Sequence, residues 1–120
     1  MYSVQVLDHF QNPRNAGELA DADAAAEIEN PACGDVLRLT LKVSQGRITA
    51  VRFKAKGCVA SVACASVLTE LVAGKTIQNA RSLRREDLMV AVGGLPQAST
   101  HAAQLAVDAL SVVLNQVDAG

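Results

Sequence analysis

The stretch that most constrains the fold is residues 53–70, which reads as a strand that ends at a glycine and continues directly into a helix. Gly57 marks the turn, and Cys58 follows it at the expected start of the helix. Free backbone N–H groups and the positive end of the helix dipole meet at a helix N-terminus and favour a negatively charged sulfur there. We therefore predict that Cys58 is a metal ligand or a nucleophile. The alternative is a small buried residue that closes the corner between strand and helix.

Composition restricts the class of protein. A chain of 120 residues is expected to form one domain, residues 1–120, whose core needs no disulfide. Hydrophobic residues make up 50% and charged residues 19%, and no apolar run is long enough to span a bilayer, so we expect a globular domain without a membrane partner. Aromatic residues are only 2% and the net charge is -1, which argues against a nucleic-acid partner.

Cysteine usage and the N-terminal sequence indicate the compartment. The chain has 3 cysteines, which cannot all pair with one another. Its first residues contain no basic region followed by an apolar signal run. We therefore expect a cytoplasmic protein with reduced thiols.

Hydrophobic periodicity predicts an α+β fold. Residues 36–44 alternate apolar and polar side chains, as in a strand with one buried face, and residues 47–55 return as its partner with a bulge near Ala50. Residues 24–29 are expected to form the first strand. Helices are expected over residues 4–10, 59–73 and 84–92, after Thr76, and from an N-cap at Ser99 or Thr100 onward.

The same periodicities predict which side chains fill the core between the sheet and the helices. In the first helix Val6, Leu7 and Phe10 lie at helical spacing on one face. The residues that we expect to share this core are Leu37, Leu39, Leu41, Val43, Phe53, Val62, Leu68, Leu105, Leu110 and Val113.

Side chains able to bind a metal gather in predicted loops and at helix starts. Cys33 and Asp35 lie in a loop bounded by proline and glycine, Cys58 begins one helix, and His101 lies in the first turn of another. Thiolate and imidazole ligands suit zinc, iron or an iron–sulfur cluster better than magnesium or calcium. Because no pair forms a Cys-x-x-Cys motif, spacing alone leaves a thiolate metal site as one possibility. His9 is a lone helical histidine, which is more often a packing residue.

Several blocks of sequence together are similar to one known family. These are residues 7–17 (LDHFQNPRNAG), 30–35 (NPACGD), 57–58 with 68–70 (LTE), 74–76 (GKT), and Leu-Pro at 95–96 followed by His101. Through them, nearly the whole chain resembles the IscU/NifU N-terminal-type iron–sulfur cluster assembly scaffold family. The resemblance implies a three-stranded antiparallel sheet under a layer of helices, and a scaffold rather than an enzyme.

The resemblance also implies a ligand set. In that family cysteines bind the cluster together with an aspartate that tunes its lability and a neighbouring histidine, and the matching positions here are Cys33, Asp35, Cys58 and His101. The third family cysteine, which accepts sulfur from a cysteine desulfurase, directly follows the histidine. This chain has Ala102 there, so that role is not carried over.

Ala102 and the neighbouring segment carry two further expectations. Because Ala102 follows His101 in the first helical turn, a cysteine introduced there is expected to lie near the other ligands without adding a polar group to the core. The family's Leu-Pro-Pro-Val-Lys chaperone segment reads LPQAS at residues 95–99, so chaperone docking is not expected.

Cys64 is not expected to replace the missing ligand. At about 100° per residue, Cys58 and Cys64 lie roughly 120° apart around a helix and more than one turn apart along it. Cys64 instead aligns with Val67 and Leu68 on a face that is expected to point into the core. We therefore expect Cys64 to be buried and chemically quiet.

Three functions follow from these residues. We favour a scaffold or carrier that holds iron or a [2Fe–2S] cluster for transfer to recipient apoproteins, because mixed thiolate and imidazole ligation is feasible, as Rieske centres show. The alternative is a degenerate family member that binds a single zinc through the same four positions and has a structural or regulatory role. An enzyme with Cys58 as nucleophile and His101 as base has the least support, since no oxyanion-hole motif is found.

Overall fold

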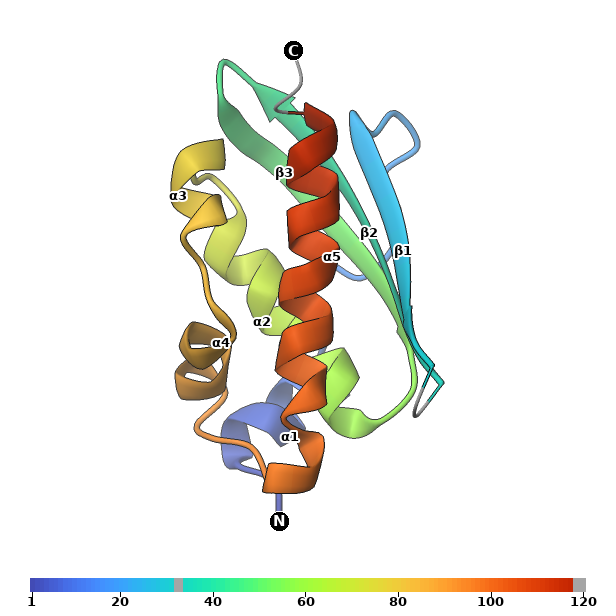
Figure 1. The fold of residues 1–120 in the computed structure, drawn as a ribbon, viewed down its shortest axis with the longest axis vertical. Coiled ribbons are helices and arrows are strands. Elements are labelled where there is room, and N and C mark those ends of the chain that lie inside the picture. Colours follow the sequence, from blue (N-terminus) through green and yellow to red (C-terminus); the bar gives the residue numbers. More distant parts are fainter. Residues whose placement is uncertain (32–33, 118–120) are drawn as a thin grey trace.

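The computed structural model describes residues 1–31 and 34–117, so the predicted ligand Cys33 lies outside the described residues. The elements follow in the order α1 (Val4–Gln11), β1 (Ala24–Asn30), β2 (Asp35–Ser44), β3 (Arg47–Lys56), α2 (Val59–Val72), α3 (Ile77–Arg81), α4 (Arg85–Ala91), the 3-10 helix η1 (Gln97–Ser99) and α5 (His101–Val117). The strands form an antiparallel sheet in the order β1-β2-β3, and the helices lie on one side of it (Figure 1). The predicted α+β architecture is confirmed.

The β2–β3 pairing contains the predicted bulge. Lys42 pairs with Ala50 while Val43 pairs with Ile48, so one residue of β3, Thr49, is left without a partner in the register. The extra residue changes which side of the strand faces the helices. Both Ile48 and Val51 are consequently buried, although they are three positions apart.

The core lies between the inner face of the sheet and helices α2 and α5. Of the predicted core residues in the sheet and these helices, all are buried except Val43 and Val62, which are partly buried and pack against the core. None of the helices in the described ranges is long and apolar enough to cross a membrane.

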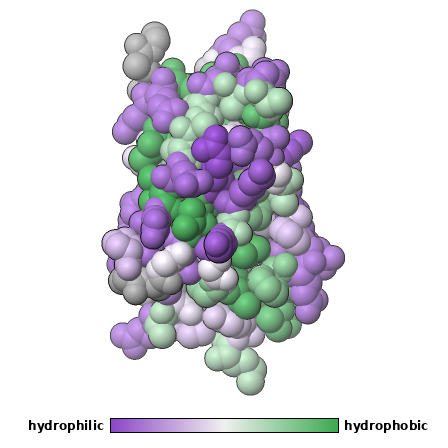
Figure 2. Space-filling model, turned by 90° about the vertical axis from the view of Figure 1, so that its right-hand side faces the viewer, coloured by the Kyte–Doolittle hydropathy of each residue, from purple (hydrophilic) through white to green (hydrophobic). Residues whose placement is uncertain are grey.

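The outer face of the sheet is polar, as alternation along β2 predicts. Arg38 pairs with Glu18 at 2.9 Å and Lys42 with Asp21 at 2.9 Å. Hydrophilic side chains cover much of the molecule on the side of the strands (Figure 2). The sheet therefore contributes one face to the core and presents the other to solvent.

Helix α1 is less buried than its pattern indicated. The predicted N-cap is confirmed, because the Ser3 hydroxyl accepts the N–H of Val6 at 3.0 Å. Val6 is buried, whereas Leu7 and Phe10 on the same apolar face are 42% and 41% exposed. The reason is that α1 packs mainly against a single helix, α2, which covers only part of a wide apolar stripe.

The segment after α1 binds to polar groups of α2 and to β3. Asn15 has a positive φ of 59°, and its carbonyl accepts the N–H of Phe53 at 3.0 Å. The buried hydroxyl of Ser66 accepts the N–H of Arg14 at 2.8 Å and lies 2.8 Å from His9 Nδ1. Burial, more than the charge of Arg14, lowers the pKa of His9. His9 thus packs against α2, in keeping with its interpretation as a packing residue.

Candidate metal centre

Three elements bring metal-ligating side chains to one point. Asp35 is the first residue of β2, Cys58 is the N-cap of α2 directly after β3, and His101 is the first residue of α5. One ligand atom from each lies within 4.8 Å of the other two. Asp35 is buried, whereas Cys58 and His101 are partly exposed, so the group opens toward solvent on the sulfur and imidazole side. Of the four predicted ligand residues, the structure thus brings three together.

Gly57 allows the close approach of Asp35 to the strand–helix turn. Its φ is +145°, and a Cβ built on it would lie 2.1 Å from Asp35 Oδ1. No side chain fits at residue 57 unless the carboxylate moves. The next residue, Cys58, has extended backbone angles and donates its N–H to Asp35 Oδ1 at 3.2 Å. The amide at the start of α2 therefore binds the carboxylate.

The other carboxylate oxygen, Oδ2 of Asp35, has several neighbours. It accepts the hydroxyl of Ser61 at 2.5 Å, and it lies 3.4 Å from Cys58 Sγ and 3.2 Å from His101 Nε2. Ser61 Oγ also lies 3.3 Å from Cys58 Sγ. Ser61 is not among the residues predicted from the sequence. Its position was the available signal, because side chains three residues apart share one face of a helix and point toward its N-terminus.

The short helix η1 orients His101. The imidazole Nδ1 lies 3.2 Å from the carbonyl of Ala98, and since a carbonyl only accepts, the hydrogen belongs on Nδ1. In the neutral ring this leaves the lone pair of Nε2 directed toward Asp35 and Cys58, which suits a metal ligand. His101 also lines a hollow of about 260 Å³ between β1 and α5, together with Ile28, Glu29, Asn30, Pro31, Gln104, Leu105 and Asp108.

The start of α5 differs from the prediction. An N-cap at Ser99 or Thr100 was expected, but Ser99 belongs to η1, and the Thr100 hydroxyl donates to the carbonyl of Gln97 at 3.1 Å. The 3-10 helix η1 ends at Ser99 and α5 begins at His101, so the chain is helical on both sides of Thr100.

Two residues near the ligands are buried. Cys64 is 0% exposed, as predicted, and burial raises the pKa of its thiol to about 12. Ala102 is 1% exposed, so the prediction that a thiol there adds no polar group to the core is wrong. The reason is geometric: residue 102 lies about 100° around the helix from His101, on the side that packs against the rest of the protein.

The donor set decides which ions fit. One sulfur, one carboxylate and one imidazole suit zinc or iron, whereas magnesium and calcium prefer oxygen ligands. Within residues 1–31 and 34–117, no second group of metal-ligating side chains lies as close together. Ion binding at this point is the chemistry that the arrangement supports.

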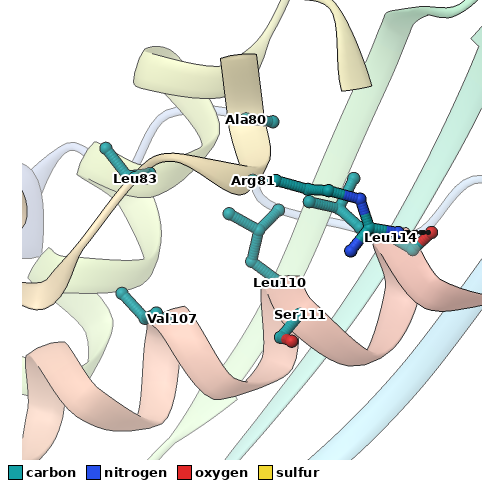
Figure 3. A pocket seen from close by; sticks show the side chains of 7 residues that line it. All are labelled: Ala80, Arg81, Leu83, Val107, Leu110, Ser111 and Leu114. Carbon is teal, nitrogen blue, oxygen red and sulfur yellow. Dashed lines mark hydrogen bonds between the residues drawn. The ribbon is translucent and has the colours of Figure 1, made fainter. Parts of the chain in front are cut away.

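A separate hollow between α3 and α5 lacks such chemistry (Figure 3). Arg81 reaches across it and donates to Asn115 Oδ1 at 3.0 Å and to the carbonyl of Leu114 at 3.2 Å. The volume of this hollow is about 120 Å³, and the other residues that line it are Ala80, Leu83, Val107, Leu110 and Ser111. We interpret the hydrogen bonds of Arg81 as a structural contact that holds α3 against the C-terminal end of α5.

Comparison with known proteins defines the family. The family model described as "NifU-like N terminal domain" matches residues 1–118, and the chain belongs to this family. It is 46% identical to the iron-sulfur cluster assembly scaffold protein IscU 1 of Archaeoglobus fulgidus, over 92% of this chain and 72% of that protein. It is 37% identical to the scaffold protein IscU of Escherichia coli K12, over 94% of this chain and 91% of that protein.

A solved structure shows the same fold. The crystal structure of a nitrogen-fixing NifU-like protein (N-terminal) from Brucella abortus superposes with a TM-score of 0.80 at 22% identity, and covers 98% of this chain and 94% of that one. The α+β arrangement of a three-stranded sheet and helices is therefore that of NifU-like domains.

Proposed function

We propose that this protein is an iron–sulfur cluster assembly scaffold, which binds iron or a [2Fe–2S] cluster as its cargo and passes it to recipient apoproteins. The observation that carries the proposal is the convergence of Asp35, Cys58 and His101 from three separate elements. Relatives at 46% and 37% identity are named as scaffold proteins, which supports a carrier rather than an enzyme. Residues 1–120 would act as one IscU/NifU-like domain.

Each ligand has a distinct part in this role. Cys58 supplies a thiolate, the ligand that cluster iron prefers. His101 supplies a neutral nitrogen, and Asp35 supplies a harder oxygen that binds iron less firmly than sulfur does. Cys33 completes the proposed set of four by resemblance. A set that includes weaker ligands suits cargo that must leave again.

The role requires partners of two kinds. A cysteine desulfurase would supply sulfur, and apoproteins would receive the finished cluster. Ala102 has no thiol and cannot itself accept sulfur. We place the protein in the cytoplasm, because Cys58 and Cys64 are free thiols and a reducing compartment keeps them so.

Anaerobic reconstitution with iron and sulfide tests the proposal. We expect the wild-type protein to gain the visible absorption of a [2Fe–2S] cluster, and Cys58→Ala and His101→Ala to lose most of it. Cys64→Ala is the matched control, since it removes a thiol of the same helix that lies in the core. A protein that binds zinc but forms no cluster would favour the structural zinc alternative, and one that binds neither would refute the site.

A further inference from the structure

A buried hydroxyl lies behind the candidate ligands. Ser61 is only 4% exposed, and it lies three residues after Cys58 in the first turn of α2. A buried serine in a helix commonly donates back to a carbonyl of the preceding turn. Here the hydroxyl donates at 2.5 Å to Asp35 Oδ2, which is 26 residues away in the sequence. The side chain therefore connects the helix to a candidate ligand.

Asp35 is thereby held at both oxygens. Its Oδ1 accepts the backbone N–H of Cys58 at 3.2 Å, and its Oδ2 accepts the hydroxyl of Ser61. Two donors on one helix turn fix the rotation of the carboxylate as well as its position. A carboxylate oxygen has room for more than one partner, so Oδ2 can accept from Ser61 and still bind a cation.

The fixed orientation places Oδ2 where a shared cation needs it. This oxygen lies 3.2 Å from His101 Nε2 and 3.4 Å from Cys58 Sγ, so it faces both of the other candidate ligands. We propose that Ser61 is a positioning residue of the metal site, whose hydroxyl orients Asp35 so that Asp35, Cys58 and His101 bind one cation. The inference rests on the proposed function, because it requires these residues to be ligands.

The expected effect follows from how such partners act. A group that hydrogen-bonds to a metal ligand fixes its orientation, and its loss typically lowers metal affinity about 10–100-fold. Ser61→Ala removes the hydroxyl and keeps the helix, because alanine is the best helix former. We therefore expect Ser61→Ala to bind a divalent metal about 10–100-fold more weakly than wild type.

Cobalt(II) titration of the metal-free, reduced protein measures this. Co²⁺ takes ligands similar to those of zinc, and its visible bands report both thiolate binding and geometry. For Ser61→Ala we expect weaker binding and shifted bands, and for Ser61→Thr, which keeps a hydroxyl, a return toward wild type. Ser66→Ala is the matched control. Its hydroxyl is also buried in α2, but it contacts His9 and Arg14 rather than the ligands, so we expect wild-type cobalt binding.

A double-mutant cycle with Asp35→Ala shows whether Ser61 acts through the carboxylate. Once Asp35 is removed, Ser61→Ala should lower cobalt affinity no further. A further loss in the double variant would contradict the inference even if Ser61→Ala alone does not fold, since the double variant leaves no buried carboxylate without its donor.

Four results would overturn the inference. They are wild-type affinity in Ser61→Ala, an equal loss in Ser66→Ala, no recovery in Ser61→Thr, or a further loss in the Asp35→Ala background. If wild type itself binds no cobalt, the proposed function fails, and the inference fails with it.

Discussion

The carboxylate of Asp35 occupies the space in which residue 57 would carry a side chain. Any Cβ on Gly57 would lie 2.1 Å from Asp35 Oδ1, far inside contact distance, and the backbone there has a φ of +145°. The turn between β3 and α2 and the candidate ligand at the start of β2 therefore depend on each other. A substitution at Gly57 is therefore expected to move the carboxylate of Asp35 and so to alter the candidate metal site.

We predict that Gly57→Ala will both weaken metal binding and destabilise the fold. A side chain must displace Asp35, and the strained backbone adds a cost of about 1–3 kcal/mol in the free energy of unfolding. Gly46→Ala is the control, because Gly46 also has a positive φ but nothing within 4 Å of its built Cβ. We expect it to lower stability and leave cobalt affinity unchanged. Equal cobalt affinity in Gly57→Ala and wild type would contradict the coupling.

The core prediction concerns Leu41, which is 0% exposed in the middle of the sheet. Leu41→Ala should reduce the free energy of unfolding by about 2–5 kcal/mol, because it removes buried methyl groups and leaves a cavity. Urea denaturation followed by circular dichroism measures the change. Val90→Ala is the control, since Val90 is 81% exposed and its truncation should matter by less than about 0.5 kcal/mol. An unchanged midpoint in Leu41→Ala would contradict its place in the core.

The described cysteines should differ in reactivity. In metal-free folded protein, brief alkylation should label Cys58, which is partly exposed at a helix start, and spare the buried Cys64. Mass spectrometry of the digested protein reports each site, and labelling in urea provides the control in which both react. Preferential labelling of Cys64 in the folded protein would show that its side chain is accessible and reopen it as a ligand.

The same thiol predicts a pH dependence of stability. Burial raises the pKa of Cys64 to about 12 in the folded state, whereas an unfolded cysteine titrates near about 8.5. Below the pKa of the unfolded state, the Cys64 thiol is protonated in both the folded and the unfolded protein, so its titration does not change the free energy of unfolding. Above it the unfolded state alone loses the proton, so the free energy of unfolding should fall by about 1.4 kcal/mol per pH unit.

Urea denaturation of wild type and Cys64→Ala at several alkaline pH values isolates this contribution, because the other groups titrate alike in both proteins. The difference in stability between them should shrink or reverse as pH rises from about 8 to 10. Parallel curves would show that Cys64 keeps an ordinary pKa in the folded protein.

Ala102→Cys tests the position at which the resemblance implies a third cysteine ligand. We expect the variant to hold more [2Fe–2S] cluster, and for longer, than wild type after anaerobic reconstitution, because cluster iron prefers thiolate to carboxylate or imidazole. Since residue 102 is buried, the metal-free variant should also be less stable than wild type. Equal cluster content and half-life in the two proteins would show that a thiol at residue 102 is not needed.

Local patterns predicted most of the fold. The bulge could be inferred because the apolar positions change phase between Ile48 and Val51, and a period-two pattern breaks only where the strand does. The strand–helix turn at Gly57 could also be predicted, because the apolar positions change there from period two to helical spacing. The partial exposure of Leu7 and Phe10 could not be predicted, because an apolar stripe does not reveal how much of it the neighbouring helix covers.

The candidate site was predicted less completely. Ligand types at loops and helix starts pointed to Asp35, Cys58 and His101, but the burial of Ala102 and the role of Ser61 depend on contacts between distant parts of the chain. Helix spacing places Ser61 on the same face as Cys58, but the Ser61–Asp35 hydrogen bond joins residues on different elements, which spacing within one helix does not reveal. Residues that position ligands are therefore harder to predict than the ligands themselves.

Asp35 and His101 are 66 residues apart in the sequence, and one begins a strand while the other begins the last helix. A cation bound by both acts as a cross-link between the sheet and α5, and it stabilises the folded chain in proportion to the logarithm of its concentration over its dissociation constant. In the proposed role, a loaded cation would therefore hold α5 to the sheet more firmly than an empty site does. A recipient that withdraws the cargo would remove this cross-link in the same step.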